Sequence, residues 1–256
     1  MEFSNYNKSF SLEGRLNIGV LVIHGFTSTP QSIEYYFKKM NEYGFHVEVP
    51  VLTGHAASWE EMNKITYHEW IKNVNNSYKK LADRVSKVFV AGLSMGGALA
   101  LKLAELNKNI NGIILINHAI FLKRDWRLLF LLIIMHFKAS DAAKIGGDLK
   151  DPDAYELTYN RIPLKGVYQL MRLQKEVRRI HTKITKPVLI FKSVIDHVLP
   201  DKCAQYTMKH IASKEKKIIL LENSYHAATL DYDKDLIVEK SKEFINLVSA
   251  PNHAVL

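Results

Sequence analysis

The chain has 256 residues, 47% of them hydrophobic and 24% charged, which fits one globular domain with a substantial core. A single cysteine, Cys203, excludes an internal disulfide, and the N-terminal stretch lacks the apolar core of a signal peptide, so we expect a cytoplasmic protein. The longest apolar run, Leu128–Met135, is far shorter than the roughly 20 residues of a membrane-spanning helix.

Short β-branched runs alternate with longer amphipathic segments, which predicts the α/β class, with helices around a mostly parallel sheet. The expected strands are nearly continuous apolar runs, as in a sheet covered on both faces. They span residues 19–23, 46–49, 87–91, 113–116, 187–191 and 217–221. The helices expected between them span residues 30–43, 66–81, 94–106, 201–211 and 234–247, the first with Pro30 in its first turn and Thr29 as its cap.

One interval breaks this alternation. Between residues 118 and 186 no buried strand pattern occurs, whereas helical patterns cover 127–137 and 167–180. Structureless loops of this length are uncommon inside compact domains. We therefore expect a helical cap at 118–186 over the C-terminal edge of the sheet, where ligands bind in such folds, and a core formed by 1–117 and 187–256.

The distribution of charge also singles out this interval. The formal net charge is +9, and residues 119–183 carry 13 Lys or Arg against 7 Asp or Glu. Because the most apolar run lies in the same stretch, the cap could make transient contact with an anionic lipid surface. A solvated lysine-rich surface explains the charge equally well, and we expect no nucleic-acid partner.

The strongest chemical signal is Gly92-Leu93-Ser94-Met95-Gly96, which follows a predicted strand and opens a predicted helix. A sharp turn at this junction lifts the serine oxygen clear of the sheet, and the flanking glycines let neighbouring backbone pass closely. Because the context is strand, turn and helix, we expect Ser94 to be a nucleophile rather than an ordinary serine in a capping turn.

A serine needs a base to remove its proton, and the base needs a carboxylate to orient it. His226 follows the last predicted strand and Asp196 follows the one before it, so both should lie at the same sheet edge as Ser94. The chain order Ser, Asp, His is that of α/β-hydrolases. Asp201, Asp231 and Asp233 lie near predicted helix starts and are interpreted as caps.

The tetrahedral oxyanion of acyl transfer needs two backbone donors. One should be the amide of Met95, directly after the nucleophile, and the other the amide of Phe26 in the loop after the first buried strand. His24 precedes that loop in a His-Gly turn, and we expect it to brace the loop rather than to act as a base.

Taken together, the motifs resemble bacterial monoacylglycerol lipases and the related small carboxylesterases of the α/β-hydrolase superfamily. The resemblance runs from about residue 19 to 245 and is carried by HGFTSTPQSIEYY, VPVLTGHA, GLSMGGALALKLA, GIILINHAI, IFKSVIDHVLP and LLENSYHAATLDYDKDLIVEKSKEFI. It implies an α/β-hydrolase fold, a small-molecule ester or monoacylglycerol as substrate, Ser94, Asp196 and His226 as the catalytic triad, and Phe26 with Met95 as oxyanion donors.

The resemblance further implies a polar pocket for the glycerol headgroup. Its counterparts in this chain are Asn117 and Glu156, with Ile145 as the neighbouring contact from the cap. Each residue also has an ordinary structural interpretation: Asn117 could end a strand, Glu156 could be solvated and Ile145 could belong to the core.

The sequence thus favours hydrolysis of carboxylic esters through an acyl-enzyme on Ser94, without a metal or organic cofactor. Three alternatives stay open: a general short-chain carboxylesterase without glycerol preference, a hydrolase of C–C bonds or thioesters, and a non-catalytic ligand-binding protein on the same fold. The sequence carries no signal for oligomeric state or for acyl chain length.

Overall fold

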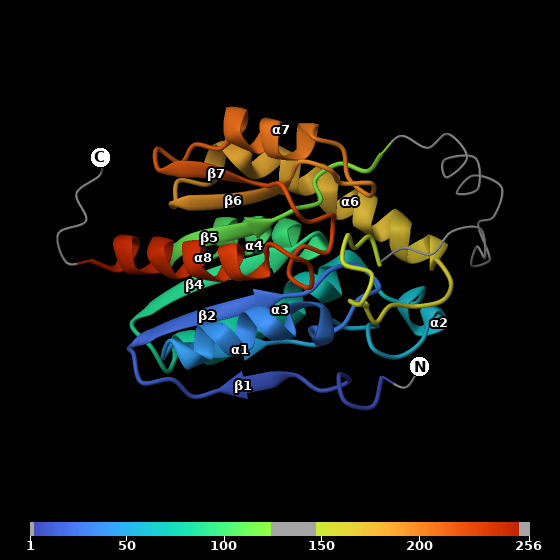
Figure 1. Cartoon of the computed structure of the whole chain (residues 1–256), viewed down its shortest axis with the longest axis horizontal. Coiled ribbons are helices and arrows are strands. Elements are labelled where there is room, and N and C mark those ends of the chain that lie inside the picture. Colours follow the sequence, from blue (N-terminus) through green and yellow to red (C-terminus); the bar gives the residue numbers. More distant parts are fainter. Residues whose placement is uncertain (1–2, 124–146, 251–256) are drawn as a thin grey trace.

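The computed structural model describes residues 3–123 and 147–250, and within them a seven-stranded sheet lies between two layers of helices (Figure 1). Along the sheet the strand order is β1-β3-β2-β4-β5-β6-β7. β1 pairs antiparallel with β3, and all other neighbours are parallel. The strands are β1 (Phe10–Leu12), β2 (Ile18–Ile23), β3 (His46–Val49), β4 (Lys87–Leu93), β5 (Ile110–Ile116), β6 (Val188–Ser193) and β7 (Lys216–Leu221).

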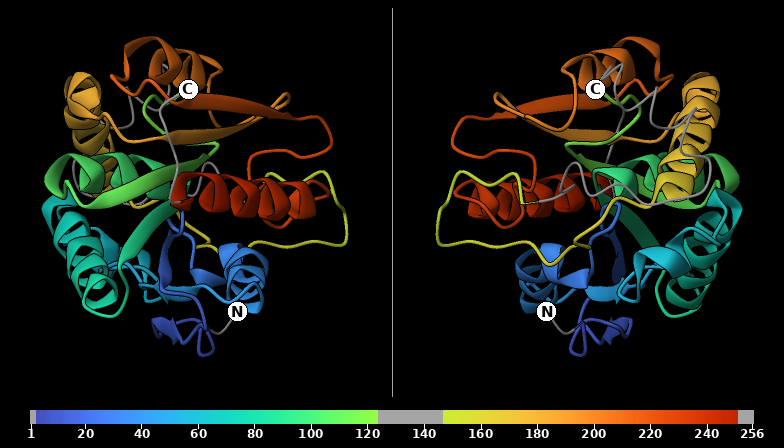
Figure 2. Two further views of the ribbon diagram at one scale, coloured as in Figure 1. Left: turned by 90° about the vertical axis from the view of Figure 1, so that its left-hand side faces the viewer. Right: turned by 90° about the vertical axis from the view of Figure 1, so that its right-hand side faces the viewer.

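Helices cover both faces of the sheet, as the end-on views of Figure 2 show. On one face lie the 3-10 helix η1 (Pro30–Ile33), α1 (Glu34–Glu42) and α8 (Lys234–Ser249). On the other face lie α3 (Tyr67–Ala82), α4 (Met95–Leu106), α6 (Leu164–Ile180) and α7 (Lys202–His210). The short helices α2 (Trp59–Met62) and η2 (His181–Lys183) complete the described elements.

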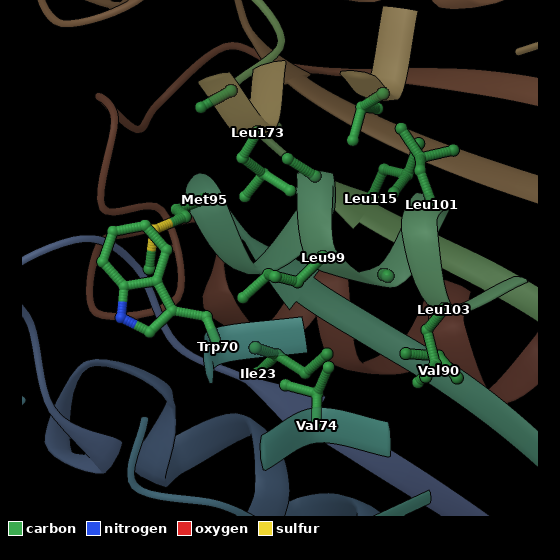
Figure 3. Packing of buried hydrophobic residues seen from close by; sticks show 14 of the residues in the cluster. Ile23, Trp70, Val74, Val90, Met95, Leu99, Leu101, Leu103, Leu115 and Leu173 are labelled. Atoms are coloured by element: carbon green, nitrogen blue, oxygen red, sulfur yellow. The ribbon is translucent and has the colours of Figure 1, made fainter. Parts of the chain in front are cut away.

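The apolar runs of the sequence explain this layering, because alternate residues of one strand enter different cores. In β2, Val20 and Val22 pack with the α1 and α8 side, whereas Leu21 and Ile23 pack with the α3 and α4 side. In the core on the α3 and α4 side, the fully buried indole of Trp70 lies against neighbours from α4 and the sheet (Figure 3). Burial on both faces gives the sheet a rigid frame, and the loops at its C-terminal edge are held by that frame.

The predicted α/β class is confirmed, and every expected strand is present to within a few residues. The helix expected at 30–43 is split into η1 and α1, and Thr29 caps η1 as expected, since its hydroxyl accepts from the amide of Gln31 at 3.2 Å. Three short elements, β1, α2 and η2, were not anticipated. The start of α2 does carry a signal, because the Ser58 hydroxyl accepts from the amide of Glu61 at 3.3 Å, three residues on.

The interval assigned to the cap is described only in part. The helix expected at 167–180 is present as α6, but it packs beside α3 and α4. It therefore belongs to the helical layer of the core, whereas the sequence placed it in a cap over the sheet edge. The helix expected at 127–137 and the apolar run 128–135 lie outside the described residues. Within 3–123 and 147–250, no helix has the length and apolar character needed to cross a bilayer.

Candidate active site

Ser94 lies at the junction of β4 and α4 in a strained turn. Its φ of 55° and ψ of −116° are unusual for a residue with a side chain, and such outliers gather at functional sites. Glycine is required on both sides of it: a Cβ on Gly92 would lie 2.2 Å from the carbonyl carbon of Gly96, and one on Gly96 would lie 2.1 Å from the carbonyl oxygen of Ile23. The turn therefore presents the serine hydroxyl at the C-terminal edge of the sheet, as the motif predicted.

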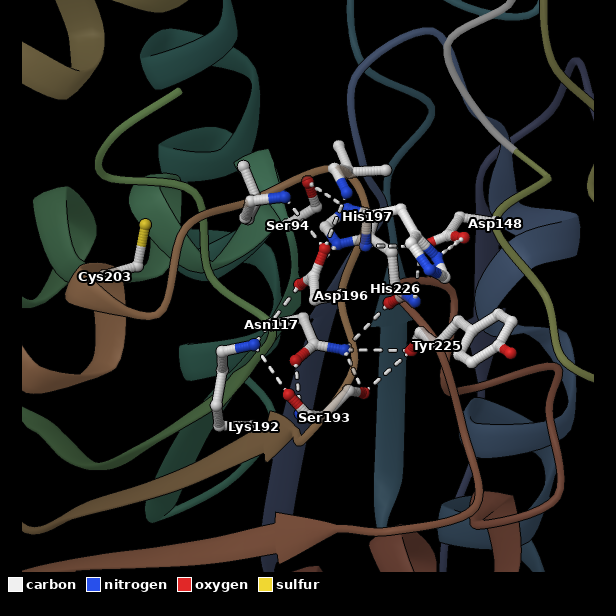
Figure 4. A network of polar contacts seen from close by, with 12 residues as sticks. Ser94, Asn117, Asp148, Lys192, Ser193, Asp196, His197, Cys203, Tyr225 and His226 are labelled. Atoms are coloured by element: carbon white, nitrogen blue, oxygen red, sulfur yellow. Dashed lines mark hydrogen bonds and ion pairs between the residues drawn. The ribbon is translucent and has the colours of Figure 1, made fainter. Parts of the chain in front are cut away.

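The structure brings Ser94, His226 and Asp196 together from three separate strand ends (Figure 4). The Oγ of Ser94 lies 3.0 Å from Nε2 of His226, and Nδ1 of the same ring lies 3.1 Å from Oδ2 of Asp196. The side chains of Asp196 and His226 are 1% and 9% exposed, so water has little access to their hydrogen bond. This is a continuous path for a proton from the hydroxyl to the imidazole.

The carboxylate of Asp196 is held by the backbone as well as by the imidazole. Its Oδ1 accepts from the amides of Val198 and Leu199 at 2.9 and 2.8 Å, which leaves Oδ2 facing His226. Burial disfavours its ionised form, but the hydrogen bond and charge of His226, the Leu199 amide and the charge of Lys192 outweigh that effect and lower the pKa of Asp196 to about 2. The carboxylate is therefore ionised at neutral pH.

The loop after β2 lies directly on the nucleophile. A Cβ built on Gly25 would lie 3.5 Å from Cβ of Ser94, so the loop that carries Phe26 passes close to the serine. Met95 is the first residue of α4, where an amide has no carbonyl acceptor inside the helix. Phe26 and Met95 therefore belong to the two segments that adjoin Ser94, and the Phe26 ring lies in a buried aromatic cluster with His55 and Trp70.

His24 braces this loop, as expected. Its ring is fully buried, Nδ1 donates to the carbonyl of Gly25 at 3.0 Å, and Nε2 accepts from the amide of Leu52 at 3.2 Å. Both nitrogens are therefore engaged by the neutral form of the ring. Burial lowers the pKa of His24 to about 4, although the bond to the Gly25 carbonyl opposes that shift. A histidine so engaged has no lone pair to offer a reacting group.

Asn117 follows β5 at the same edge, but its amide is fully used inside the protein. Its Oδ1 accepts from the Ser193 amide at 2.8 Å, and its Nδ2 donates to the Ser193 hydroxyl at 2.8 Å, to the His226 carbonyl at 2.9 Å and to the Tyr225 carbonyl at 3.3 Å. The residue is 1% exposed and has a φ of 41°. This geometry supports its ordinary structural role at a strand end, where it ties β5 and β6 to the loop that carries the imidazole, over a contact with a headgroup.

The two other predicted headgroup residues lie in or beside the cap interval. Ile145 is outside the described residues. Glu156 is partly exposed, and its Oε2 accepts from the amide of Gly147 at 2.8 Å. The residue after that glycine, Asp148, reaches the site: its Oδ2 accepts from the amide of His226 at 3.2 Å. Glu156 is thus fixed to the segment that contacts the imidazole loop.

Three aspartates interpreted as helix caps have other partners. Asp231 is fully buried and accepts from amides of two separate segments, those of Lys150, Asp151, Tyr225 and Tyr232. Asp233 accepts from Asn223, and Asp201 pairs with Lys192 at 3.2 Å, while neither side chain caps its helix. Asp201 and Asp233 thus occupy the N-cap positions of α7 and α8, as expected, but their carboxylates bind other partners and make no capping hydrogen bond, and Asp231 is not a cap residue.

Sequence reasoning missed two charged residues beside the imidazole. Asp148 binds the amides of both His197 and His226, and the ring of His197 as well. Lys192 is buried behind Asp196, 3.7 Å from Oδ2. The sequence did contain a signal for Lys192, since a lysine follows the apolar run of the strand VLIFKS. Among the described residues no three His, Cys, Asp or Glu gather in a way that could hold a metal ion.

Comparisons with known proteins agree with this geometry. A family model described as "Serine aminopeptidase, S33" matches residues 17–233. A thermostable monoacylglycerol lipase from Bacillus sp. (strain H-257) is 40% identical over 232 residues, 89% of this chain and 90% of the relative. A carboxylesterase from Bacillus subtilis (strain 168) is 26% identical over 93% of this chain and 96% of the relative. A solved structure from work on the metagenome-derived lipolytic enzymes LipS and LipT is 34% identical, with a TM-score of 0.89 over 94% of this chain and 98% of that one.

Proposed function

Because this chain belongs to the serine hydrolase family described as "Serine aminopeptidase, S33", with the α/β-hydrolase fold, we propose that it hydrolyses carboxylic esters, monoacylglycerols first among them, through an acyl-enzyme on Ser94. The observation that carries the proposal is the connected path from the Ser94 hydroxyl through His226 to Asp196. The relatives support the substrate class, since one is a monoacylglycerol lipase and another a carboxylesterase.

In the first half of the reaction, Ser94 attacks the ester carbonyl while Nε2 of His226, 3.0 Å away, takes the hydroxyl proton. The ionised Asp196 keeps the proton-bearing Nδ1 pointing away from the serine and stabilises the imidazolium that forms. His226 then returns its proton to the leaving alcohol, which is glycerol when the substrate is a monoacylglycerol. The acyl group remains on the serine oxygen.

The amides of Phe26 and Met95 are the proposed donors to the tetrahedral oxyanion. Each comes from a rigid part of the frame, the tight turn on Ser94 and the first turn of α4. Such preorganised donors stabilise charge that exists only in the transition state, and loss of one typically costs about 2.7–4 kcal/mol. In the second half of the reaction, water attacks the acyl-enzyme with His226 as base, and the fatty acid leaves. The scheme requires no metal or organic cofactor.

For the alcohol side of the substrate, Glu156 and Ile145 remain the proposed headgroup contacts. Glu156 is bound to Gly147, next to the residue that holds the His226 amide, so it lies in the segment that adjoins the imidazole loop. Asn117 is better explained as a brace of that loop. The cap was expected at 118–186, and α6 belongs to the core. We therefore further propose that residues 118–163, which precede α6, form a cap that admits the acyl chain and makes transient contact with lipid.

We also propose that the protein is cytoplasmic. Cys203 is a buried free thiol, which fits the reducing environment of the cytoplasm. A monoacylglycerol would then reach the enzyme from a membrane surface or from a lipid aggregate.

The second candidate function is that of a general short-chain carboxylesterase, favoured by the similarity to the Bacillus subtilis carboxylesterase. A panel of 1-monoacylglycerols, methyl esters and p-nitrophenyl esters with matched acyl chains separates the two. The proposed function predicts a higher kcat/KM for a monoacylglycerol than for the methyl ester of the same acid. Equal values would establish the general esterase, and no hydrolysis of any ester would refute both.

A further inference from the structure

A buried lysine lies behind the carboxylate that orients the imidazole. Lys192, the next-to-last residue of β6, is 6% exposed, and its Nζ lies 3.7 Å from Oδ2 of Asp196. The same oxygen faces Nδ1 of His226 at 3.1 Å, and the ammonium also donates to the Ser193 carbonyl at 2.6 Å (Figure 4). A lysine is seldom buried without a reason, since its charge loses hydration there.

A second carboxylate completes a row of alternating charges. Oδ1 of Asp201 lies 3.2 Å from Nζ of Lys192. The side chain of Asp201 is 72% exposed, whereas those of Lys192 and Asp196 are 8% and 1% exposed. Water screens the outer pair more than the inner pair, so the ammonium acts most strongly on Asp196.

The proton affinity of an imidazole depends on the net charge beside it. A carboxylate beside an imidazole favours the protonated form of the ring. A cation next to the carboxylate reduces this effect. We propose that Lys192 acts through Asp196 to set the basicity of His226, so that the imidazole is neutral and ready to act as a base near neutral pH.

This assignment rests on the proposed function, because it concerns the same site. Lys192 is a positioning residue in this role, since it touches neither the serine nor the place of the substrate. The direction of its effect on Asp196 agrees with the geometry: among the groups that lower the pKa of that carboxyl against the effect of burial is the charge of Lys192. Lys192 lies near the end of β6 and Asp196 follows four residues later, so the short segment after the strand brings the two side chains together.

Other ionisable groups face the same pair from the neighbouring segments, and their charges are retained in the variants proposed below. Lys123 donates to the backbone carbonyl of Asp196 at 2.9 Å. Asp148 accepts from the His226 amide and pairs with the ring of His197 at 2.7 Å. Further groups in the described part of the chain are the Asp231 carboxylate, on the Tyr225 amide, and the thiol of Cys203 on α7, whose pKa is raised by burial. The buried ring of His118 also faces Lys192, and burial, His181 and the charge of Lys192 lower the pKa of His118.

Two substitutions should move the imidazole in opposite directions. Lys192→Met removes the charge and keeps an unbranched side chain, so the pKa of His226 should rise by roughly 0.5–1.5 units. Asp201→Asn removes the exposed partner and leaves the ammonium less neutralised, so the pKa of His226 should fall by a smaller amount. Lys192→Arg retains the charge and should stay near the wild type, and Lys217→Met, on the exposed edge strand β7, is the matched control.

The readout is an NMR titration of the ¹⁵N-labelled His226 ring, assigned with a His226→Gln variant, together with the acidic limb of kcat/KM. Shifts of opposite sign in Lys192→Met and Asp201→Asn support the proposal, and an unchanged titration in both folded variants overturns it. If Lys192→Met does not fold, the sign of the shift in Asp201→Asn decides. Because the titration needs no turnover, an imidazole that shifts in a protein inactive on esters would refute the proposed function and leave this inference standing.

Discussion

Replacement of Asn117 separates two roles for one residue, a contact with the substrate headgroup and a brace beneath the imidazole loop. In Asn117→Ala the Ser193 amide and the His226 carbonyl both lose their partner in a buried site. Each unsatisfied group costs about 1–3 kcal/mol, so the free energy of unfolding should fall by about 2–6 kcal/mol. The φ of 41° adds about 1 kcal/mol for alanine, which Asn117→Gly avoids.

The effect on catalysis should follow from the displaced loop. If Asn117 is a brace, kcat should fall by about 10- to 100-fold on a monoacylglycerol and on the methyl ester of the same acid, and the ratio of their KM values should not change. Urea unfolding of the wild type, Asn117→Ala and Asn117→Gly measures the stability, and steady-state kinetics on the two esters measures the site. A selective rise in KM for the monoacylglycerol, with normal stability and normal kcat on the methyl ester, would refute the brace and restore the headgroup contact.

Three further predictions follow from the described contacts. Asp196→Asn should keep the fold and lower kcat by about 10⁴-fold with little change in KM, because the imidazole loses the group that fixes its tautomer; a near-normal kcat would move the acid role elsewhere. Burial lowers the pKa of His24 to about 4, below its unfolded value near 6.5, so the folded protein keeps the ring neutral and its stability falls as pH drops from 6.5 towards 4. At pH 5 this effect of His24 should lower the free energy of unfolding by about 2 kcal/mol relative to its value well above pH 6.5. A His24→Gln variant whose stability falls as steeply as that of the wild type between pH 7 and pH 5 would contradict this prediction. Gly96→Ala should lower the free energy of unfolding by about 3 kcal/mol or more, since its Cβ would lie 2.1 Å from the Ile23 carbonyl oxygen, and a denaturation midpoint like that of the wild type would argue against the tight turn.

The sequence could predict the parts of the fold that depend on local pattern. Continuous apolar runs located the six parallel strands, and the glycines around Ser94 indicated the turn whose close contacts admit no side chain. β1 was missed because three residues with alternating exposure give no apolar run. The helix α6 was recognised but assigned to the cap, because its sequence shows an apolar face and does not show which layer that face meets.

The site was predictable where a residue follows a strand, and less so where its partner comes from far along the chain. Ser94 directly follows β4 and His226 lies in the loop after β7, so parallel topology alone brought them to one edge. Asp148 could not be found in this way, since its partners at His197 and His226 are 49 and 78 residues away. The same holds for Asp231, whose position before a helix suggested a cap although its carboxylate binds loop amides.

The most direct test of the account is a comparison of wild type and Ser94→Ala, both folded, in monoacylglycerol hydrolysis and in labelling by a fluorophosphonate. Wild type should release fatty acid and carry one phosphonyl group on Ser94 by peptide mass spectrometry, and Ser94→Ala should do neither. Substantial ester hydrolysis by pure Ser94→Ala, or a folded wild type that hydrolyses esters without a label on Ser94, would contradict the connected path from hydroxyl to imidazole to carboxylate as the source of activity.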